Sequence, residues 1–198
     1  MLSRISDVFS KSLANQIIEI AGILKDDYQI LEIGAGNGTM AKDILLHLAE
    51  NDQLPEKYLI LEVSPNLRER QKALISQALP EYIENVEWIA EPPKIAWKGV
   101  IVANEVIDAL SVERFRIFEG EIHYVDVGLE VDEMQKTVSF TPVLREADAA
   151  LLAFKQDLAE KGIELPEGYE SEYCPSVKTW LAPFFEHLSE GAALFIDY

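Results

Sequence analysis

The sequence predicts an α/β protein whose sheet is doubly wound and mainly parallel. Short apolar runs recur along the chain, and few polar residues interrupt them. Amphipathic segments lie between the first three runs. Strands that helices cover on both faces have this character, because neither face needs to be polar. The alternation of strand and helix further predicts right-handed crossovers between parallel strands.

The first elements follow from the spacing of apolar residues. Leu13, Ile17 and Leu24 repeat at helical intervals, which predicts an amphipathic helix that begins near Ser6 or Asp7 as its N-cap. The parallel strands are expected at residues 29–33, 58–62, 86–90, 100–103 and 192–197.

Two crossover helices are expected between the first three strands. One covers 39–50, and the other begins at Ser64 and Pro65, an N-cap residue and a first-turn proline, and ends near Leu79. Together with the strands, they give the order that defines the doubly wound class.

The pattern changes after the fourth strand. Residues 113–143 alternate between apolar and charged side chains around a tight turn at Glu119-Gly120-Glu121, which predicts an antiparallel hairpin or a three-stranded excursion. A helix is expected over 145–161, then a loop, then a last helix from Pro175 to just before Gly191.

The composition limits the possible partners. The 198 residues include 17 Lys and Arg against 35 Asp and Glu, for a net charge of −18. This acidity argues against nucleic acid or an anionic membrane as the main partner, because both attract basic surfaces. No apolar stretch is long enough to predict membrane insertion, and charges scattered through the first 24 residues do not fit a signal peptide.

A glycine-rich loop follows the first predicted strand, with Gly34 and Gly36 before the helix that starts near Thr39. Such a loop lets a ligand approach the backbone at a helix N-terminus. A nicotinamide or flavin site favours glycine or alanine at the position of Thr39 and an acid about 20 residues onward. Here Glu62 lies 28 residues after Gly34. A dinucleotide site and a purely structural turn remain alternatives.

An acid two residues before the first glycine makes the loop similar to that of class I methyltransferases, which bind S-adenosylmethionine. In that interpretation Glu32 lies near the ammonium and sulfonium charges of the cofactor. Glu62, at the end of the neighbouring strand, is placed to accept hydrogen bonds from both ribose hydroxyls.

Polar residues also follow the fourth strand, at the sheet edge where ligands bind in open α/β sheets. They are Asn104, Glu105 and Asp108, and the two acids share one face if a helical turn starts there. Paired carboxylates can hold a guanidinium or ammonium group and accept a proton from it. A helix cap with two solvated acids is the alternative.

Four blocks of sequence resemble the MidA family of methyltransferases. They are Glu32-Ile33-Gly34-Ala35-Gly36-Asn37-Gly38-Thr39, Leu61-Glu62-Val63-Ser64-Pro65-Asn66-Leu67, Ala103-Asn104-Glu105-Val106-Ile107-Asp108-Ala109-Leu110 and Ile196-Asp197-Tyr198. The second and third blocks are more specific than the glycine loop. Members of the family use S-adenosylmethionine, and its mitochondrial members act as complex I assembly factors that dimethylate an arginine of a core subunit.

The resemblance implies a class I, Rossmann-like methyltransferase fold and a protein arginine as acceptor. No metal is expected, because His47, His123 and His187 lie far apart with no second ligand at metal spacing. The resemblance also implies two groups of site residues. Asn104, Glu105 and Asp108 would line the catalytic cleft. The cofactor-binding residues would be Glu32, Gly34, Ala35, Gly36, Glu62 and Val63.

The chain also departs from the family pattern. Asn37 stands where a basic residue is frequent, and Val106 and Ile107 replace two aromatics, a change that affects the acceptor side. The family's sheet has seven strands, and only five are found here. We therefore expect one truncated domain over 1–198, with an insertion at 111–170 and the last two strands missing.

Other functions stay open at this point. The chain could be an inactive, methyltransferase-like scaffold that binds a partner protein, or a methyltransferase acting on a small molecule. Trp88, in the third predicted strand, is a candidate for stacking on adenine, although a core role is the alternative. The expected location is the cytoplasm for a bacterial protein and the mitochondrial matrix for a eukaryotic one.

Overall fold

The computed structural model describes residues 2–25, 27–132, 134 and 136–197. The chain divides into two compact units, which we describe separately. One unit comprises Met1–Ala109 with Thr179–Tyr198, and the other comprises Leu110–Lys178.

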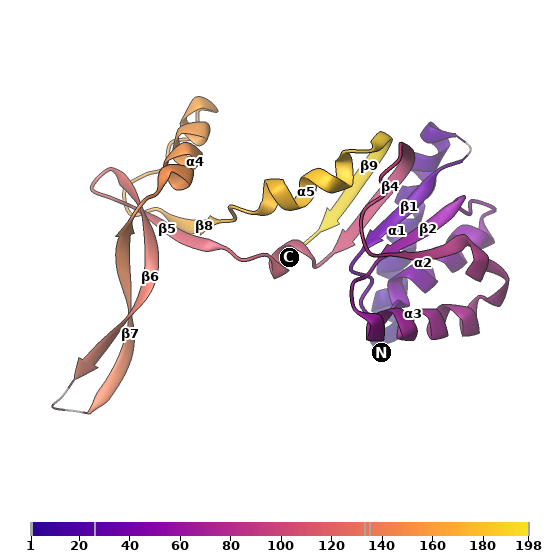
Figure 1. The fold of residues 1–198 in the computed structure, drawn as a ribbon, viewed down its shortest axis with the longest axis horizontal. Helices are drawn as coiled ribbons and strands as arrows, with labels where there is room; N and C mark the ends of the chain where they lie inside the picture. Colours follow the sequence, from indigo (N-terminus) through magenta and orange to yellow (C-terminus); the bar gives the residue numbers. More distant parts are fainter. Residues whose placement is uncertain (1, 26, 133, 135, 198) are drawn as a thin grey trace. The chain divides into compact units, whose positions relative to one another are not determined.

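A five-stranded parallel sheet forms the centre of the first unit, in the order β3-β2-β1-β4-β9 (Figure 1). The strand order reverses between β1 and β4, and such a switch point is where open α/β sheets bind ligands. The predicted parallel sheet is therefore confirmed. Its strands are β1 (Gln29–Ile33), β2 (Lys57–Leu61), β3 (Val86–Ile89), β4 (Trp97–Asn104) and β9 (Leu188–Ile196).

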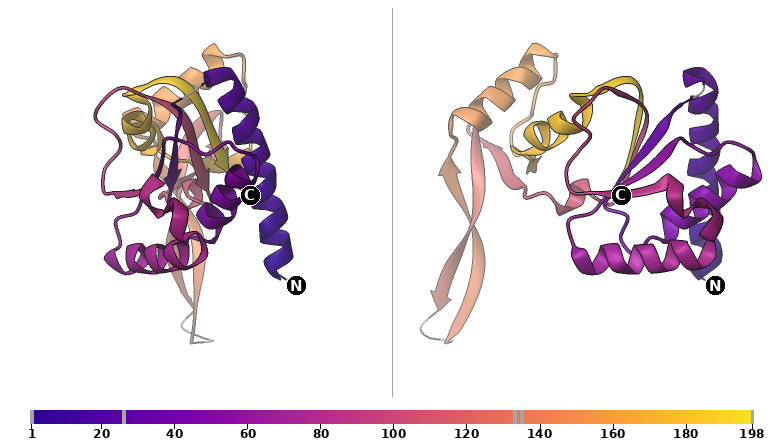
Figure 2. Two further views of the ribbon diagram at one scale, coloured as in Figure 1. Left: turned by 90° about the vertical axis from the view of Figure 1, so that its right-hand side faces the viewer. Right: turned by 45° about the vertical axis from the view of Figure 1, so that its right-hand side comes forward.

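Helices cover both faces of this sheet. Side chains of α1, α2 and α3 pack on one face, and α1 lies beside α2 (Figure 2). Trp180 and Phe184 of α5 pack on the other face. The bounds are α1 (Leu2–Leu24), α2 (Thr39–Glu50), α3 (Pro65–Ala78), the 3-10 helix η1 (Pro80–Asn85) and α5 (Val177–Phe185).

Three boundaries differ from the sequence expectation. Helix α1 begins at Leu2, ahead of the expected caps. The last helix ends at Phe185, because the following residues enter β9, where Gly191 pairs with Gly99 of β4. A short strand, β8 (Glu170–Tyr173), replaces part of the expected loop.

The second unit is an antiparallel sheet in the order β7-β6-β5-β8, packed against α4. Glu119 and Gly120 connect β5 to β6 with positive φ at both residues, as a two-residue hairpin turn requires. The predicted hairpin and helix are confirmed. The bounds are β5 (Glu113–Phe118), β6 (Glu121–Asp132), β7 (Thr137–Glu146) and α4 (Ala149–Glu160).

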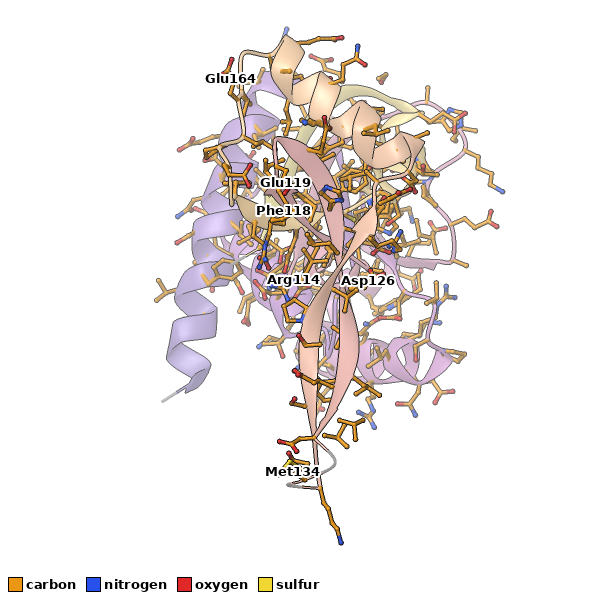
Figure 3. The ribbon with its side chains drawn as sticks, turned by 90° about the vertical axis from the view of Figure 1, so that its left-hand side faces the viewer. Arg114, Phe118, Glu119, Asp126, Met134 and Glu164 are labelled. Atoms are coloured by element: carbon orange, nitrogen blue, oxygen red, sulfur yellow. The ribbon has the colours of Figure 1, made fainter. Side chains whose placement is uncertain are left out.

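Strands β6 and β7 continue past β5 as a two-stranded ribbon with Met134 at its tip (Figure 3). Leu129 pairs with Phe140 across the ribbon, and both side chains are exposed. No helix in the described part of the chain is long and apolar enough to cross a membrane.

The backbones of β1 and β4 approach each other closely at Gly99, and this close approach can be tested by substitution. A Cβ atom at Gly99 would lie 1.8 Å from the carbonyl oxygen of Gln29, so Gly99→Ala is expected to lower the free energy of unfolding by about 3 kcal/mol or more. Urea denaturation measures this change.

Gly22→Ala is the matched control. It lies in α1 with open space around it, so alanine is expected to stabilise the protein by about 0.5–1 kcal/mol. A Gly99→Ala protein as stable as the wild type would contradict the close packing.

Candidate functional site

A cavity of about 720 Å³ lies in the first unit, at the carboxyl ends of β1 and β4. This is the switch point of the sheet, where the strand order reverses. Residues from α1, β1, the glycine loop, α2 and the end of β4 line it. They are Phe9, Ser10, Glu32, Gly34, Ala35, Gly36, Asn37, Thr39, Met40, Asn104 and Glu105.

The glycine loop turns sharply from β1 into α2. Gly34, Gly36 and Gly38 all have positive φ, between 55° and 84°, which residues with a Cβ rarely adopt. The side chain of Asn37 accepts a hydrogen bond of 3.0 Å from the backbone N–H of Thr39, at the start of α2. Asn37 therefore helps to begin the helix.

Glu32 presents a buried carboxyl group to the cavity. Its side chain is fully buried, and Tyr58 on β2 donates a hydrogen bond of 2.7 Å to Oε2. Burial raises the pKa of Glu32 to about 7, although the bond from Tyr58 acts in the opposite direction. Burial and the neighbouring carboxylate also raise the pKa of Tyr58. The carboxyl is therefore poised to change its charge near neutral pH.

Three buried side-chain oxygens of the cavity residues have no hydrogen-bond partner among the residues that the structure describes. They are Oε1 of Glu32, Oδ1 of Asn104 and Oε1 of Glu105. A buried acceptor without a partner is unfavourable, so three of them around one cavity indicate a ligand that supplies hydrogen-bond donors.

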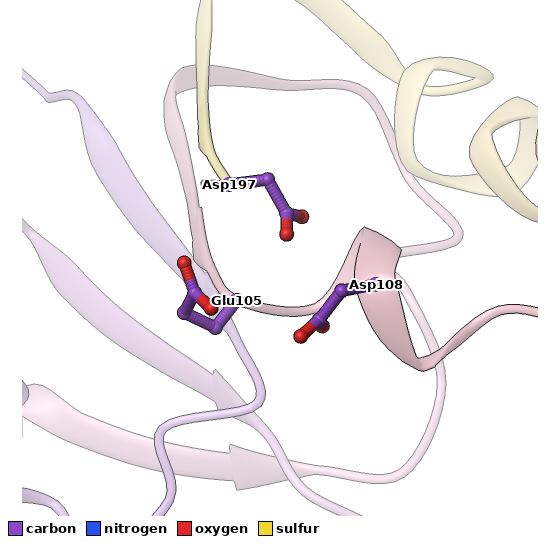
Figure 4. Close-up of side chains that lie close together, drawn as sticks. All are labelled: Glu105, Asp108 and Asp197. Atoms are coloured by element: carbon purple, nitrogen blue, oxygen red, sulfur yellow. The ribbon is translucent and has the colours of Figure 1, made fainter.

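The acids that follow β4 meet a third acid, Asp197, which directly follows β9. Glu105, Asp108 and Asp197 each bring one carboxylate oxygen within 4.8 Å of the other two (Figure 4). The backbone N–H of Ile107 donates to Oδ2 of Asp197 over 3.0 Å, and that of Glu105 donates to the carbonyl of Ile196 over 2.8 Å. The end of β9 therefore shapes this loop.

A shared helical face does not explain how Glu105 and Asp108 meet. The 3-10 helix η2 (Ile107–Ala109) contains Asp108 but not Glu105. Glu105 precedes it with a φ of 51°, in the left-handed region. The turn of the backbone at Glu105, not an i to i+3 spacing, brings the carboxylates together.

Glu62 and Val63 lie beside the cavity and do not line it. Glu62 is nearly buried, and its carboxylate accepts hydrogen bonds from the N–H of Ser64 at 2.8 Å and from Nε2 of Gln71 at 3.2 Å. Val63 is 78% exposed, so it offers an apolar surface at the end of β2. Gln71 also donates to the carbonyl of Gly36, which connects Glu62 to the glycine loop.

Sequence reasoning missed several residues of this site. Ser10 carried a signal, because it is a polar residue in line with the apolar face of α1 formed by Leu13, Ala14 and Ile17. No feature of the sequence marked Tyr58 or Gln71 as site residues, because a tyrosine in a strand and a glutamine in a helix are both common. Asp197 lay within a quoted block but had no assigned role.

Comparison with known proteins identifies the family. Residues 12–198 match the model of a family described as S-adenosyl-L-methionine-dependent methyltransferases. The match covers more than half of the chain, so the protein belongs to this family. The resemblance to the MidA family and the class I methyltransferase fold are confirmed, and S-adenosylmethionine is the family's cofactor.

One relative and two solved structures support this family assignment. The protein arginine methyltransferase NDUFAF7 homolog, mitochondrial, of Drosophila melanogaster is 27% identical over 192 residues, or 86% of this chain and 43% of the relative. A COG1565 superfamily protein of Burkholderia thailandensis, solved with S-adenosylhomocysteine bound, is 28% identical with a TM-score of 0.74, covering 97% of this chain and 47% of that one.

A second Burkholderia thailandensis structure of the same superfamily is 27% identical, with a TM-score of 0.71. It covers 100% of this chain and 50% of that chain. The present chain thus spans about half the length of the proteins it matches.

The buried carboxyl of Glu32 predicts a pH dependence of stability. Its pKa is higher in the folded than in the unfolded protein, so the folded state binds more protons between about pH 4.5 and 7, and stability falls as the pH rises through this range. Relative to Glu32→Gln, the wild type should lose about 2 to 3 kcal/mol between pH 5 and pH 8.

Urea unfolding of both proteins at the two pH values measures this difference. Glu50→Gln, at an exposed position in α2, is the control and should follow the wild type. If the free energy of unfolding depended on pH equally in the wild type and in Glu32→Gln, burial would not raise the pKa of Glu32 and the prediction would be wrong.

Proposed function

We propose that this chain binds S-adenosylmethionine in the cavity and transfers its methyl group to a guanidinium nitrogen of a protein arginine. The three buried oxygens without partners among the described residues carry the proposal. A cationic ammonium group has the donors that Glu32 and Asn104 need, and the acceptor nitrogen has the donor that Glu105 needs. The family match and the neighbour bound to S-adenosylhomocysteine support the choice of cofactor.

The residues present fit this cofactor. Glu32 and Asn104 would hold the ammonium group, while the loop from Gly34 to Gly36 lets the ligand approach the backbone. Glu62 keeps acceptor capacity for the ribose hydroxyls, and the exposed side chain of Val63 offers an apolar surface for adenine. The bound cofactor supplies a methyl group on a positively charged sulfur.

The three carboxylates at the ends of β4 and β9 support a cationic acceptor. Glu105, Asp108 and Asp197 form a cluster that matches the flat, multiply donating guanidinium group of arginine. Positioning is the main contribution that such a site makes to methyl transfer. The transfer releases one proton from the acceptor nitrogen, and Oε1 of Glu105, which has no other partner, is placed to accept it.

A protein acceptor is supported by the relative named as a protein arginine methyltransferase. That relative is named as mitochondrial, and we propose the mitochondrial matrix as the location of a eukaryotic member and the cytoplasm as that of a bacterial one. Comparing methylated proteins by mass spectrometry in cells with and without the gene identifies the acceptor. A changed small molecule with unchanged proteins would favour the small-molecule alternative.

Binding of S-adenosylhomocysteine separates an enzyme from an inactive scaffold. We expect micromolar affinity by titration calorimetry, and at pH 6 the release of up to about one proton as the ligand ammonium ionises Glu32. Repeating the titration in buffers of different ionisation enthalpy measures this proton. No binding at millimolar ligand would favour the scaffold.

Gly36→Val is expected to weaken this binding at least tenfold, because a β-branched residue is strained at a φ of 55°. Gly162→Val is the matched control. It has a similar φ of 75° and open space around it, but lies after α4 in the other unit, so it should leave the affinity unchanged.

Asp108→Ala tests the assignment of the acceptor side. Asp108 is exposed and does not line the cavity, so the variant should lose methyl transfer at least a hundredfold and keep its affinity for S-adenosylhomocysteine within threefold. Transfer to the acceptor found by mass spectrometry and calorimetry measure the two effects. EDTA should not reduce the wild-type rate, because an organic cation occupies the carboxylates.

Glu69→Ala, at an exposed position on α3, is the control and should keep both properties. An equal loss of transfer and of cofactor affinity in Asp108→Ala would contradict the acceptor role.

A further inference from the structure

Gln71 connects three parts of the first unit that are far apart in the sequence. It lies on α3 and is fully buried. Its Nε2 donates to the carbonyl of Gly36 over 2.9 Å and to Oε2 of Glu62 over 3.2 Å, and its Oε1 accepts from the indole Nε1 of Trp88 over 2.9 Å. One amide thus joins the glycine loop, the end of β2 and β3.

Trp88 fixes the orientation of this amide. An indole N–H can only donate, so it must face the oxygen of Gln71, and both amide hydrogens then face Gly36 and Glu62. Every donor of the amide has an acceptor. Trp88 therefore acts through Gln71, with its ring partly buried against the core.

The stem of Gln71 also packs against the loop. A Cβ atom at Gly38 would lie 3.2 Å from Cγ and 3.3 Å from Cα of Gln71. The glycine therefore allows α3 to approach the start of α2 closely, and Gln71 contacts the loop both through its amide and through its stem. These contacts restrict the loop relative to the end of β2.

We propose that Gln71 is a positioning residue that sets the geometry of ribose recognition. The proposal rests on the proposed function, in which Glu62 accepts hydrogen bonds from the ribose hydroxyls. Ser64 holds one oxygen of Glu62 and Gln71 holds the other, so the carboxylate cannot rotate freely. The same amide fixes Gly36, so the carboxylate and the loop backbone keep a constant spacing.

Gln71→Glu tests this role because it keeps the size of the side chain and an acceptor for Trp88. It removes both donors and places a second carboxyl against Glu62. The other charged groups nearby are Arg68, whose guanidinium donates to the carbonyl of Glu62, and Lys72, which lies over the ring of Trp88. We expect S-adenosylhomocysteine to bind at least tenfold more weakly at pH 8.

The pH dependence separates positioning from a purely structural role. At pH 5.5 a proton shared between the two carboxyls restores one donor, so the ratio of variant to wild-type dissociation constants should fall at least threefold. Gln71→Met removes all three hydrogen bonds and offers no such proton, so its ratio should not change with pH. Gln77→Glu, the same substitution at an exposed position on α3, is the control.

Discrimination between ribose and deoxyribose gives a second readout. The wild type should prefer S-adenosylhomocysteine over its 2′-deoxy analogue, and Gln71→Met should reduce this preference at least threefold. If neither Gln71 variant folds, as judged by circular dichroism, Trp88→Phe provides the test. It leaves both donor bonds of Gln71 but frees the amide to rotate, and it should weaken binding about threefold.

Glu62→Gln distinguishes failure of this inference from failure of the proposed function. If Glu62→Gln binds as tightly as the wild type, the ribose assignment is wrong, and the role of Gln71 falls with it. If Glu62→Gln loses affinity while folded Gln71 variants, or Trp88→Phe, match the wild type in affinity and ribose preference, the role of Gln71 alone is overturned.

Discussion

The site depends on the burial of a carboxyl group in the central strand of a parallel sheet. Glu32 lies on β1 between β2 and β4 with its side chain fully buried at the cavity wall, and Tyr58 is its only hydrogen-bond partner among the described residues. Keeping this group ionised costs about 3 kcal/mol at high pH. A cationic ligand in the cavity offsets that cost, because it stabilises the charged form.

The polar groups around the glycine loop fall into two sets, those with unpaired oxygens and those whose polar atoms are all hydrogen-bonded. Glu32, Asn104 and Glu105 keep oxygens without partners, and these oxygens are available to a ligand. The polar atoms of Gln71 are all paired, and they fix the backbone and Glu62. The groups proposed to bind thus keep free acceptors, while the group proposed to position them has its hydrogen bonds satisfied within the protein.

The sequence was sufficient for the sheet and for the glycine loop at its switch point, because apolar runs and glycines reflect local constraints. It was insufficient where distant contacts decide the structure. Pairing of Gly191 with Gly99 ended the last helix early, and Asp197 reached the β4 loop only because β9 lies beside β4. Gln71 could not be recognised either, since its role depends on three partners from separate segments.

The acids that produce the net charge of −18 are not all equivalent, because three of them are clustered at the site. Most acids are exposed and repel one another only weakly in salt. The carboxylates of Glu105, Asp108 and Asp197 differ, because the turn at Glu105 and the hydrogen bond from Ile107 hold them together against their mutual repulsion. Like charges at this spacing favour a cation between them. Glu105 belongs to this cluster and also lines the cavity, so a cation bound to the three carboxylates would lie at the edge of the cavity and not at a separate surface.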